Sequence, residues 1–154
     1  MSGVSGYIGQ TQGTLYAEVD IRNIVSAFRI PILVSDGSAN PFNGSLLEFS
    51  NSSAWRGQVR ANNAQIFTIA GPTSQPQGIY KVALGYKSGD SVLYVNGTQV
   101  ATSSASFTFA AALTTTNLYG ASAPNNILND RLRAAAIYPT RLSNDELQNL
   151  TRLT

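Results

Sequence analysis

Histidine and cysteine are both absent from this chain of 154 residues. Without imidazole, catalysis by a serine–histidine–aspartate triad, general-base chemistry by histidine and most catalytic zinc sites are excluded. Without thiols, a disulfide scaffold, a thiolate zinc site and a cysteine nucleophile are excluded as well. A chain of this length is expected to form one domain that buries a core of its own.

Charge is also scarce. Asp, Glu, Lys and Arg make up 12% of the residues, and the formal net charge is +2. We find no cluster of Lys and Arg of the kind that a nucleic-acid footprint needs, so we expect no nucleic-acid partner. Ser, Thr, Asn and Gln supply the surface polarity instead, and such a surface suits neutral polar ligands such as sugars.

Long apolar runs are missing too. No run approaches 18 residues, so we expect no membrane insertion, and the opening MSGVSGYIGQ lacks the basic and apolar regions of a signal peptide. Met-Ser-Gly is typical of the start of an excised domain, so we expect one domain of a longer protein. Residues 1–12 are interpreted as an N-terminal extension or linker and residues 13–154 as the domain.

Strict alternation of apolar and polar residues is what the chain does contain. In residues 13–24, the apolar side chains on one face are Leu15, Ala17, Val19 and Ile21. A period of two predicts a half-buried strand. Strand character recurs at 28–35, 45–50, 55–61, 64–70, 79–86, 91–95, 98–103, 106–111, 116–122 and 131–139. Pro31 predicts a sheet edge or a bulge, and Asn96-Gly97 predicts a type I′ hairpin because both positions need positive φ.

Only the C-terminal segment changes period. Ser143 is a good N-cap, Glu146 completes a capping box, and Leu142 and Leu147 occupy the staple positions, so a short helix is expected from about Asn144. The apolar stripe of this helix would be Leu147, Leu150 and Leu153. About ten strands with one short helix predict an all-β fold, a two-sheet antiparallel β-sandwich.

Two long stretches resemble the laminin G-like, concanavalin A-like lectin/glucanase domains. They are GIYKVALGYKSGDSVLYVNGTQVA (78–101) and LNDRLRAAAIYPTRLSNDELQNL (128–150), and the segments GSLLEFS and WRGQVRA are similar to the hairpin that precedes them in that family. The resemblance runs from about Gly13 to Leu153 and implies a jelly-roll sandwich. Tyr80 stands where the family often has tryptophan. The family includes sugar binders, protein adhesins, glycosidases and spacers.

The strand at 55–61 offers the best candidate ligand surface. Alternation places Arg56, Gln58, Arg60 and Asn62 on one face. Two guanidiniums with two amides could line a groove for acidic polysaccharide, because arginine offers forked donors to carboxylates. An ordinary polar sheet face is the alternative. Trp55 invites sugar stacking, but burial in the core explains it well and is the favoured interpretation.

An acidic motif, EVDIRN, is a candidate catalytic site. Some glucanases of this fold carry Glu-x-Asp-x-x-Glu on one strand, and Glu18 and Asp20 match its first two positions. Asn23 replaces the third, and an amide cannot protonate a leaving group. We therefore predict no catalytic residues and no enzyme activity.

A metal and an interface remain open from the sequence. Asp36, Asn40 and Asn43 lie in a loop where related domains sometimes hold calcium, which prefers several carboxylates, and this loop has one. We therefore predict no cofactor, with calcium at this loop as the alternative. The apolar stretch SSASFTFAAAL is either core or a contact with a neighbouring protomer.

Low charge, abundant Ser, Thr and Asn, and the lack of Cys and His are also similar to C-terminal domains of bacteriophage tail fibres and tailspikes. This resemblance implies a non-catalytic carbohydrate-binding module that recognises bacterial surface polysaccharide. It also implies a homotrimer attached to the rest of a parent fibre, located extracellularly on the virion tail. The alternative is a structural trimerisation or capping module of the fibre with no glycan ligand.

Overall fold

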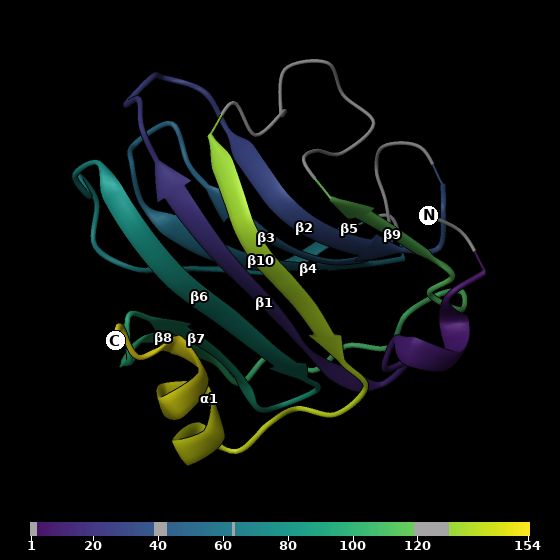
Figure 1. The fold of residues 1–154 in the computed structure, drawn as a ribbon. Helices are drawn as coiled ribbons and strands as arrows, with labels where there is room; N and C mark the ends of the chain where they lie inside the picture. Colours follow the sequence, from purple (N-terminus) through teal and green to yellow (C-terminus); the bar gives the residue numbers. More distant parts are fainter. Residues whose placement is uncertain (1–2, 39–42, 63, 119–129) are drawn as a thin grey trace.

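Two five-stranded antiparallel sheets stack face to face (Figure 1). The structure is a computed structural model, and it describes residues 3–38, 43–62, 64–118 and 130–154. One sheet has the order β10-β1-β6-β7-β8 and the other the order β5-β4-β3-β2-β9. The predicted two-sheet sandwich with a short C-terminal helix is confirmed.

The strands of the first sheet are β1 (Gln12–Ile21), β6 (Gly78–Lys87), β7 (Ser91–Val95), β8 (Thr98–Ser103) and β10 (Arg131–Tyr138). Those of the second sheet are β2 (Arg29–Ser35), β3 (Gly44–Phe49), β4 (Trp55–Ala61), β5 (Ala64–Ala70) and β9 (Thr115–Leu118). A 3-10 turn (η1, Ser5–Tyr7) precedes β1, and the helix α1 (Asn144–Thr151) follows β10.

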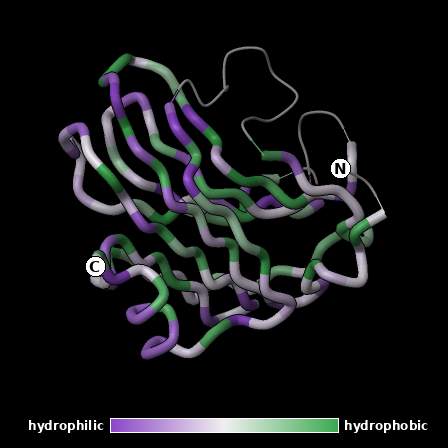
Figure 2. Tube along the Cα trace, in the orientation of Figure 1, coloured by the Kyte–Doolittle hydropathy of each residue, from purple (hydrophilic) through white to green (hydrophobic). Residues whose placement is uncertain are grey.

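The core lies between the sheets, where the inward residues of each strand meet. All four apolar residues of the predicted face of β1 are buried there. Figure 2 shows the alternation of hydrophobic and hydrophilic positions along the strands. Gly57 marks a close approach of the layers, because a Cβ at this position would lie 2.6 Å from Cδ1 of Leu84 in the opposite sheet. A larger residue at this position would therefore force the Leu84 side chain to shift.

The hairpin between β7 and β8 has the turn that its sequence predicts. Asn96 and Gly97 have φ of 49° and 79°, as a type I′ turn requires. Asn96 also ties the turn to β6, because its Oδ1 accepts a hydrogen bond of 2.9 Å from the Lys81 amide.

The helix begins at its predicted residue. Ser143 caps the helix and forms the capping box with Glu146. These hydrogen bonds from Ser143 lower the pKa of the Glu146 carboxyl. Leu147 is fully buried and Leu150 packs beside it, against a cluster that contains Tyr16. Leu153 is 47% exposed and lies beyond the end of the helix, so its predicted place in the apolar stripe is wrong.

An ion pair joins the starts of β2 and β10. Nη1 of Arg29 lies 3.0 Å from Oδ2 of Asp130, and both side chains are almost fully buried. Nη2 of Arg29 donates to the Asn23 carbonyl at 2.7 Å, and Oδ1 of Asp130 accepts from the Arg22 amide at 2.8 Å. The pair therefore fixes the connection that follows β1.

Pro31 lies at an irregularity rather than at an edge. β2 is flanked by β3 and β9, and its register with β3 shifts between Arg29 and Ile32. The bulge alternative for Pro31 is therefore confirmed.

The predicted strand at 106–111 is wrong. Its backbone bonds to side chains instead of to a neighbouring strand: the Phe107 amide donates to Ser88 Oγ and the Ala110 amide to Asn43 Oδ1. Phe107 and Leu113 are buried in the core, so the core interpretation of the SSASFTFAAAL stretch holds for these two residues. Of the predicted strand at 116–122, residues 119–122 lie outside the described residues.

The segment before β1 is packed against the sandwich. Ile8 is 3% exposed and belongs to the core cluster. The Tyr86 hydroxyl donates to the Gly9 carbonyl at 2.8 Å, and Gln10 accepts from the Leu113 amide at 2.7 Å. Packing thus begins upstream of the predicted boundary at residue 13. No helix in the described ranges has the length and apolar character to cross a bilayer.

Candidate functional site

The outer face of the second sheet presents a row of polar side chains from β4. Along this strand buried and half-buried residues alternate without interruption. Trp55, Gly57, Val59 and Ala61 face inward, which leaves Arg56, Gln58 and Arg60 outward, as the sequence predicts. The row is therefore a product of the period-two pattern and of the fully apolar inner face.

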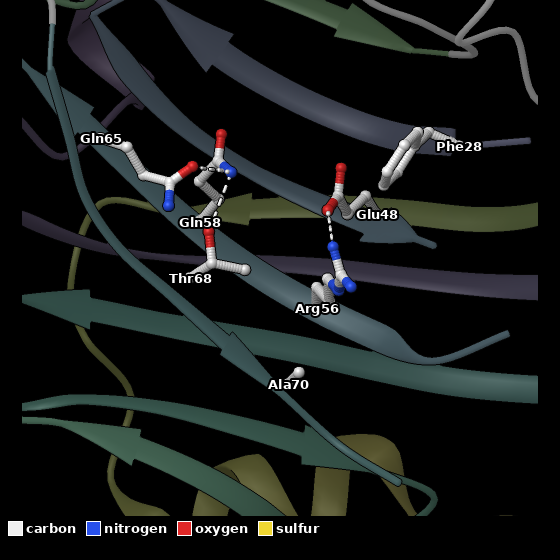
Figure 3. Close-up of a pocket in the computed structure, with 7 residues that line it drawn as sticks. All are labelled: Phe28, Glu48, Arg56, Gln58, Gln65, Thr68 and Ala70. Atoms are coloured by element: carbon white, nitrogen blue, oxygen red, sulfur yellow. Dashed lines mark hydrogen bonds and ion pairs between the residues drawn. The ribbon is translucent and has the colours of Figure 1, made fainter. Parts of the chain in front are cut away.

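A hollow of about 530 Å³ lies over this row (Figure 3). Its lining side chains come from the segment before β2 and from strands β3, β4 and β5, and they are Phe28, Glu48, Arg56, Gln58, Gln65, Thr68 and Ala70. The volume falls within the range of about 300–1,000 Å³ that small-molecule sites occupy.

Glu48 and Arg56 form an ion pair within this hollow. They are direct register partners on β3 and β4, and Nη1 of Arg56 lies 3.6 Å from Oε1 of Glu48. The Glu48 side chain is 9% exposed and that of Arg56 is 28% exposed. Burial raises the pKa of the Glu48 carboxyl, while the Arg56 guanidinium opposes that rise. The guanidinium also lies 5.8 Å from the centroid of the Phe28 ring.

Uncharged hydrogen-bonding groups form the other part of the hollow. Nε2 of Gln58 donates to Oε1 of Gln65 at 3.0 Å and to Oγ1 of Thr68 at 2.9 Å. The side-chain oxygen of Gln58 and the side-chain nitrogen of Gln65 are not used in these two hydrogen bonds. Figure 3 shows that both atoms point away from them. The hollow therefore offers a side-chain acceptor and a side-chain donor that these two hydrogen bonds do not use.

Two of the predicted site residues come together here. Arg56 and Gln58 both line the hollow. Arg60 lies on the same face but beyond the lining set, after a register shift between β4 and β5 at Val59 and Arg60. Asn62 follows the end of β4, is exposed and has a φ of 51°, so it leaves the row.

Trp55 belongs to the core. Its side chain is 1% exposed, and its ring lies 5.1 Å from that of Phe49 and 5.8 Å from that of Tyr80, centroid to centroid. An indole packed in this way has no free face for a sugar ring. The packing interpretation accounts for this residue, and a stacking role does not.

The acidic motif of β1 lies on the other sheet. Glu18 pairs with Arg133, with 2.8 Å between Oε1 and Nε, and Asp20 pairs with Arg22 at 3.1 Å. Both acidic side chains lie on the outer face of their sheet, because their neighbours Ala17 and Val19 face the core. They are therefore separated from the hollow by the whole sandwich.

The loop considered for calcium uses its polar groups internally. Oδ1 of Asp36 accepts hydrogen bonds from the amide and hydroxyl of Ser38. Asn43 is 2% exposed and bonds to the backbone of Ala110 and Ala111. Asn40 lies outside the described residues. Over the described ranges, no group of three or more Asp and Glu side chains is arranged to hold a metal ion.

Five lining residues were missed by the sequence analysis: Phe28, Glu48, Gln65, Thr68 and Ala70. Cross-strand pairing supplies the signal for two of them, because Glu48 is opposite Arg56 and Thr68 is opposite Gln58. Counting outward from the short connection between β3 and β4 gives the first of these pairs. Phe28 precedes β2 in an irregular segment, so no periodic pattern identifies it.

The sequence model of the concanavalin A-like lectin/glucanases superfamily matches residues 5–148. No curated protein sequence matches the chain. Among solved structures, the fold is similar to the CBM40 module of the IT-sialidase of Ruminococcus gnavus, with 19% identity and a TM-score of 0.71 over 93% of this chain and 84% of that one. The same module bound to α2,3 sialyllactose aligns with a TM-score of 0.72 and 19% identity over 94% and 84%.

Two further structures share the fold. A leech intramolecular trans-sialidase aligns with 20% identity and a TM-score of 0.70 over 95% of this chain and 24% of its own length. A heptameric SAP-like pentraxin from Limulus polyphemus aligns with 11% identity and a TM-score of 0.68 over 92% and 70%. At these identities the likeness shows a shared fold, so the ligand has to be argued from the residues of this chain.

Proposed function

Since the chain belongs to the concanavalin A-like lectin/glucanases superfamily, we propose that it is a non-catalytic carbohydrate-binding module whose site is the hollow over β4. The observation that supports this most is the combination of groups in the hollow. An aromatic ring, a carboxylate paired with a guanidinium, and three uncharged hydrogen-bonding side chains line one concave surface. The lining is more polar than that of most small-molecule sites, and its convergent donors and acceptors suit a ligand that carries many hydroxyl groups.

The assignment as a binder rather than a hydrolase rests on carboxylate number. Retaining and inverting glycosidases both use two carboxylic side chains about 5–9.5 Å apart. Glu48 is the single carboxylate among the described residues that line the hollow. Glu18 and Asp20 are bound to arginines on the opposite sheet.

The structural relatives favour the same class of function. The Ruminococcus gnavus module is a carbohydrate-binding module, and one of its structures holds a sialylated sugar. The alignment with this chain covers 84% of the length of that module. The hollow in this chain provides a location where a glycan could be held by side chains of its own.

The proposed setting is the receptor-binding end of a bacteriophage tail fibre or tailspike, where the module would recognise bacterial surface polysaccharide. The low charge of the chain and its lack of Cys and His motivate this setting. A single sugar site of this kind binds weakly. In a homotrimer on a fibre, the second and third binding events would be intramolecular. Avidity would then rise although the contacts within each single site stay the same.

Thermal unfolding in the presence of purified bacterial surface polysaccharides tests the proposal. A ligand of the native state at 100 times its Kd stabilises the fold by about 2.7 kcal/mol, so the melting temperature rises. Gln58→Ala removes the central amide of the hollow and should abolish the shift, whereas Gln148→Ala, on the exposed surface of α1, should keep it. If the chain is a trimer and none of the polysaccharides changes its melting temperature, the structural alternative is favoured, a capping or trimerisation module of the fibre.

A further inference from the structure

The hollow contains its own counter-ion. Among the described residues that line it, the only charged side chains are Glu48 and Arg56, and they face each other in direct register at 3.6 Å. The two charges cancel locally. The arginine that the sequence suggests as a receptor for acidic sugars is therefore already paired with a carboxylate.

The burial of the two partners makes this pairing hard to exchange. The Glu48 side chain is 9% exposed and that of Arg56 is 28% exposed, so the carboxylate is the deeper of the two. A ligand carboxylate that took over the guanidinium would leave Glu48 buried without its cation, which is strongly unfavourable. It would also approach a charge of its own sign at close range in a partly desolvated site.

A neutral sugar meets neither obstacle. Its hydroxyls both donate and accept, so they can donate to Glu48 and accept from Arg56 while the ion pair stays intact. At the other end of the hollow, the Gln58 carbonyl oxygen and the Gln65 amide nitrogen offer the same alternation without charge. These groups suit a ring that carries several adjacent hydroxyls.

Phe28 gives the hollow an apolar wall beside the ion pair. The Arg56 guanidinium carbon stands over one face of this ring, 5.8 Å from its centroid, in a cation–π arrangement. Ala70, the register partner of Arg56 on β5, lines the same hollow with only a methyl group. A sugar could rest its CH groups against the part of this half-buried ring that Arg56 leaves uncovered, while its hydroxyls reach the ion pair.

We propose that the hollow binds neutral glycans more tightly than acidic ones. The Glu48–Arg56 pair binds sugar hydroxyls, and the negative charge of Glu48 repels a ligand carboxylate. This inference rests on the proposed function of the hollow as a glycan site. It reverses the preference for acidic polysaccharide that the arginine row alone suggests.

The test measures affinity for matched pairs of oligosaccharides that have the same linkage and differ only in a neutral hexose or its uronic acid. The intact chain should bind the neutral member about tenfold more tightly or better, the size of effect expected of one like-charge contact. Glu48→Gln should narrow or reverse this ratio. Asp145→Asn removes the same charge from an exposed position on α1 and should leave the ratio unchanged.

Equal or tighter binding of the acidic members by the intact chain would overturn the inference while leaving glycan binding in place. Retention of the full neutral preference in Glu48→Gln would overturn the role of Glu48. Failure to bind any member of either series would overturn the proposed function and the inference together. The comparison in the intact chain needs no variant, so it decides the preference even if Glu48→Gln does not fold.

Discussion

Glu48 is the residue whose protonation the fold changes most directly at the candidate site. Burial raises the pKa of its carboxyl, against the opposing effect of Arg56. The native state then holds this proton more tightly than the unfolded chain does. The ionised carboxylate costs stability at neutral pH, and this cost disappears as the pH falls through the raised pKa to the ordinary range of glutamate.

The free energy of unfolding of Glu48→Gln, relative to that of the parent chain, should therefore be higher at pH 7 than at pH 4. Urea unfolding at both pH values measures the difference in free energy of unfolding between variant and parent. Asp145→Asn, which replaces an exposed carboxylate, serves as the control and should show little change at either pH. A difference that grows as the pH falls would contradict the assigned direction of the pKa shift.

Arg29 and Asp130 form the most deeply buried ion pair of the described residues. Arg29→Ala leaves a buried carboxylate without its cation, so we expect a loss of about 3–5 kcal/mol in the free energy of unfolding. Arg22→Ala breaks the pair with Asp20, in which the arginine side chain is 61% exposed, and should cost less than about 1 kcal/mol. Equal losses in chemical denaturation of the two variants would contradict the account.

Residue types alone identified part of the site. Arg56 and Gln58 were predicted because period-two alternation is local and the inner face of β4 is fully apolar. The partner of Arg56 was not predicted, because Glu48 reaches it across the sheet, and finding it requires the register of β3 and β4 to be counted outward from their connection. Trp55 was ambiguous because an indole suits both a core and a sugar site, and only its packing between the two sheets, against Phe49 and Tyr80, decides between them.

At the scale of elements, helix α1 is held by its N-terminal cap and by Leu147. Ser143→Ala removes the capping box and should lower the free energy of unfolding by about 0.5–2 kcal/mol. Ser104→Ala, in the exposed segment after β8, provides the matched control, with an expected change within about 0.5 kcal/mol. Indistinguishable melting curves for the two variants would show that the cap contributes nothing to the domain.

Elements defined by local signals were predicted well, and elements defined by distant partners were not. The Asn96-Gly97 hairpin and the capped helix each follow from a few adjacent residues. The segment at 106–111 alternates like a strand, yet its amides bond to the side chains of Ser88 and Asn43, which are far away in sequence. Alternation reports which side chains face the core, and it does not report whether a neighbouring strand is present to pair.

At the scale of the whole molecule, the proposed fibre setting requires self-association. Six large hydrophobic residues are exposed among the described positions: Tyr7, Ile24, Val25, Ile79, Leu118 and Leu153. Only Ile79 and Leu118 belong to strands, so these residues do not form one sheet face. Analytical ultracentrifugation should give three times the chain mass of 16.3 kDa. A monomer at all concentrations would contradict the trimer and leave the single site intact.

The most direct test of the account is to map a bound glycan onto the chain by the change in backbone amide NMR shifts on titration with a neutral oligosaccharide. The account predicts that the largest shifts fall on β3, β4 and β5, around Glu48, Arg56 and Thr68, and that they vanish in Gln58→Ala. Saturable shifts confined to the sheet that contains β1 and β10, or to the loops between strands, would contradict it.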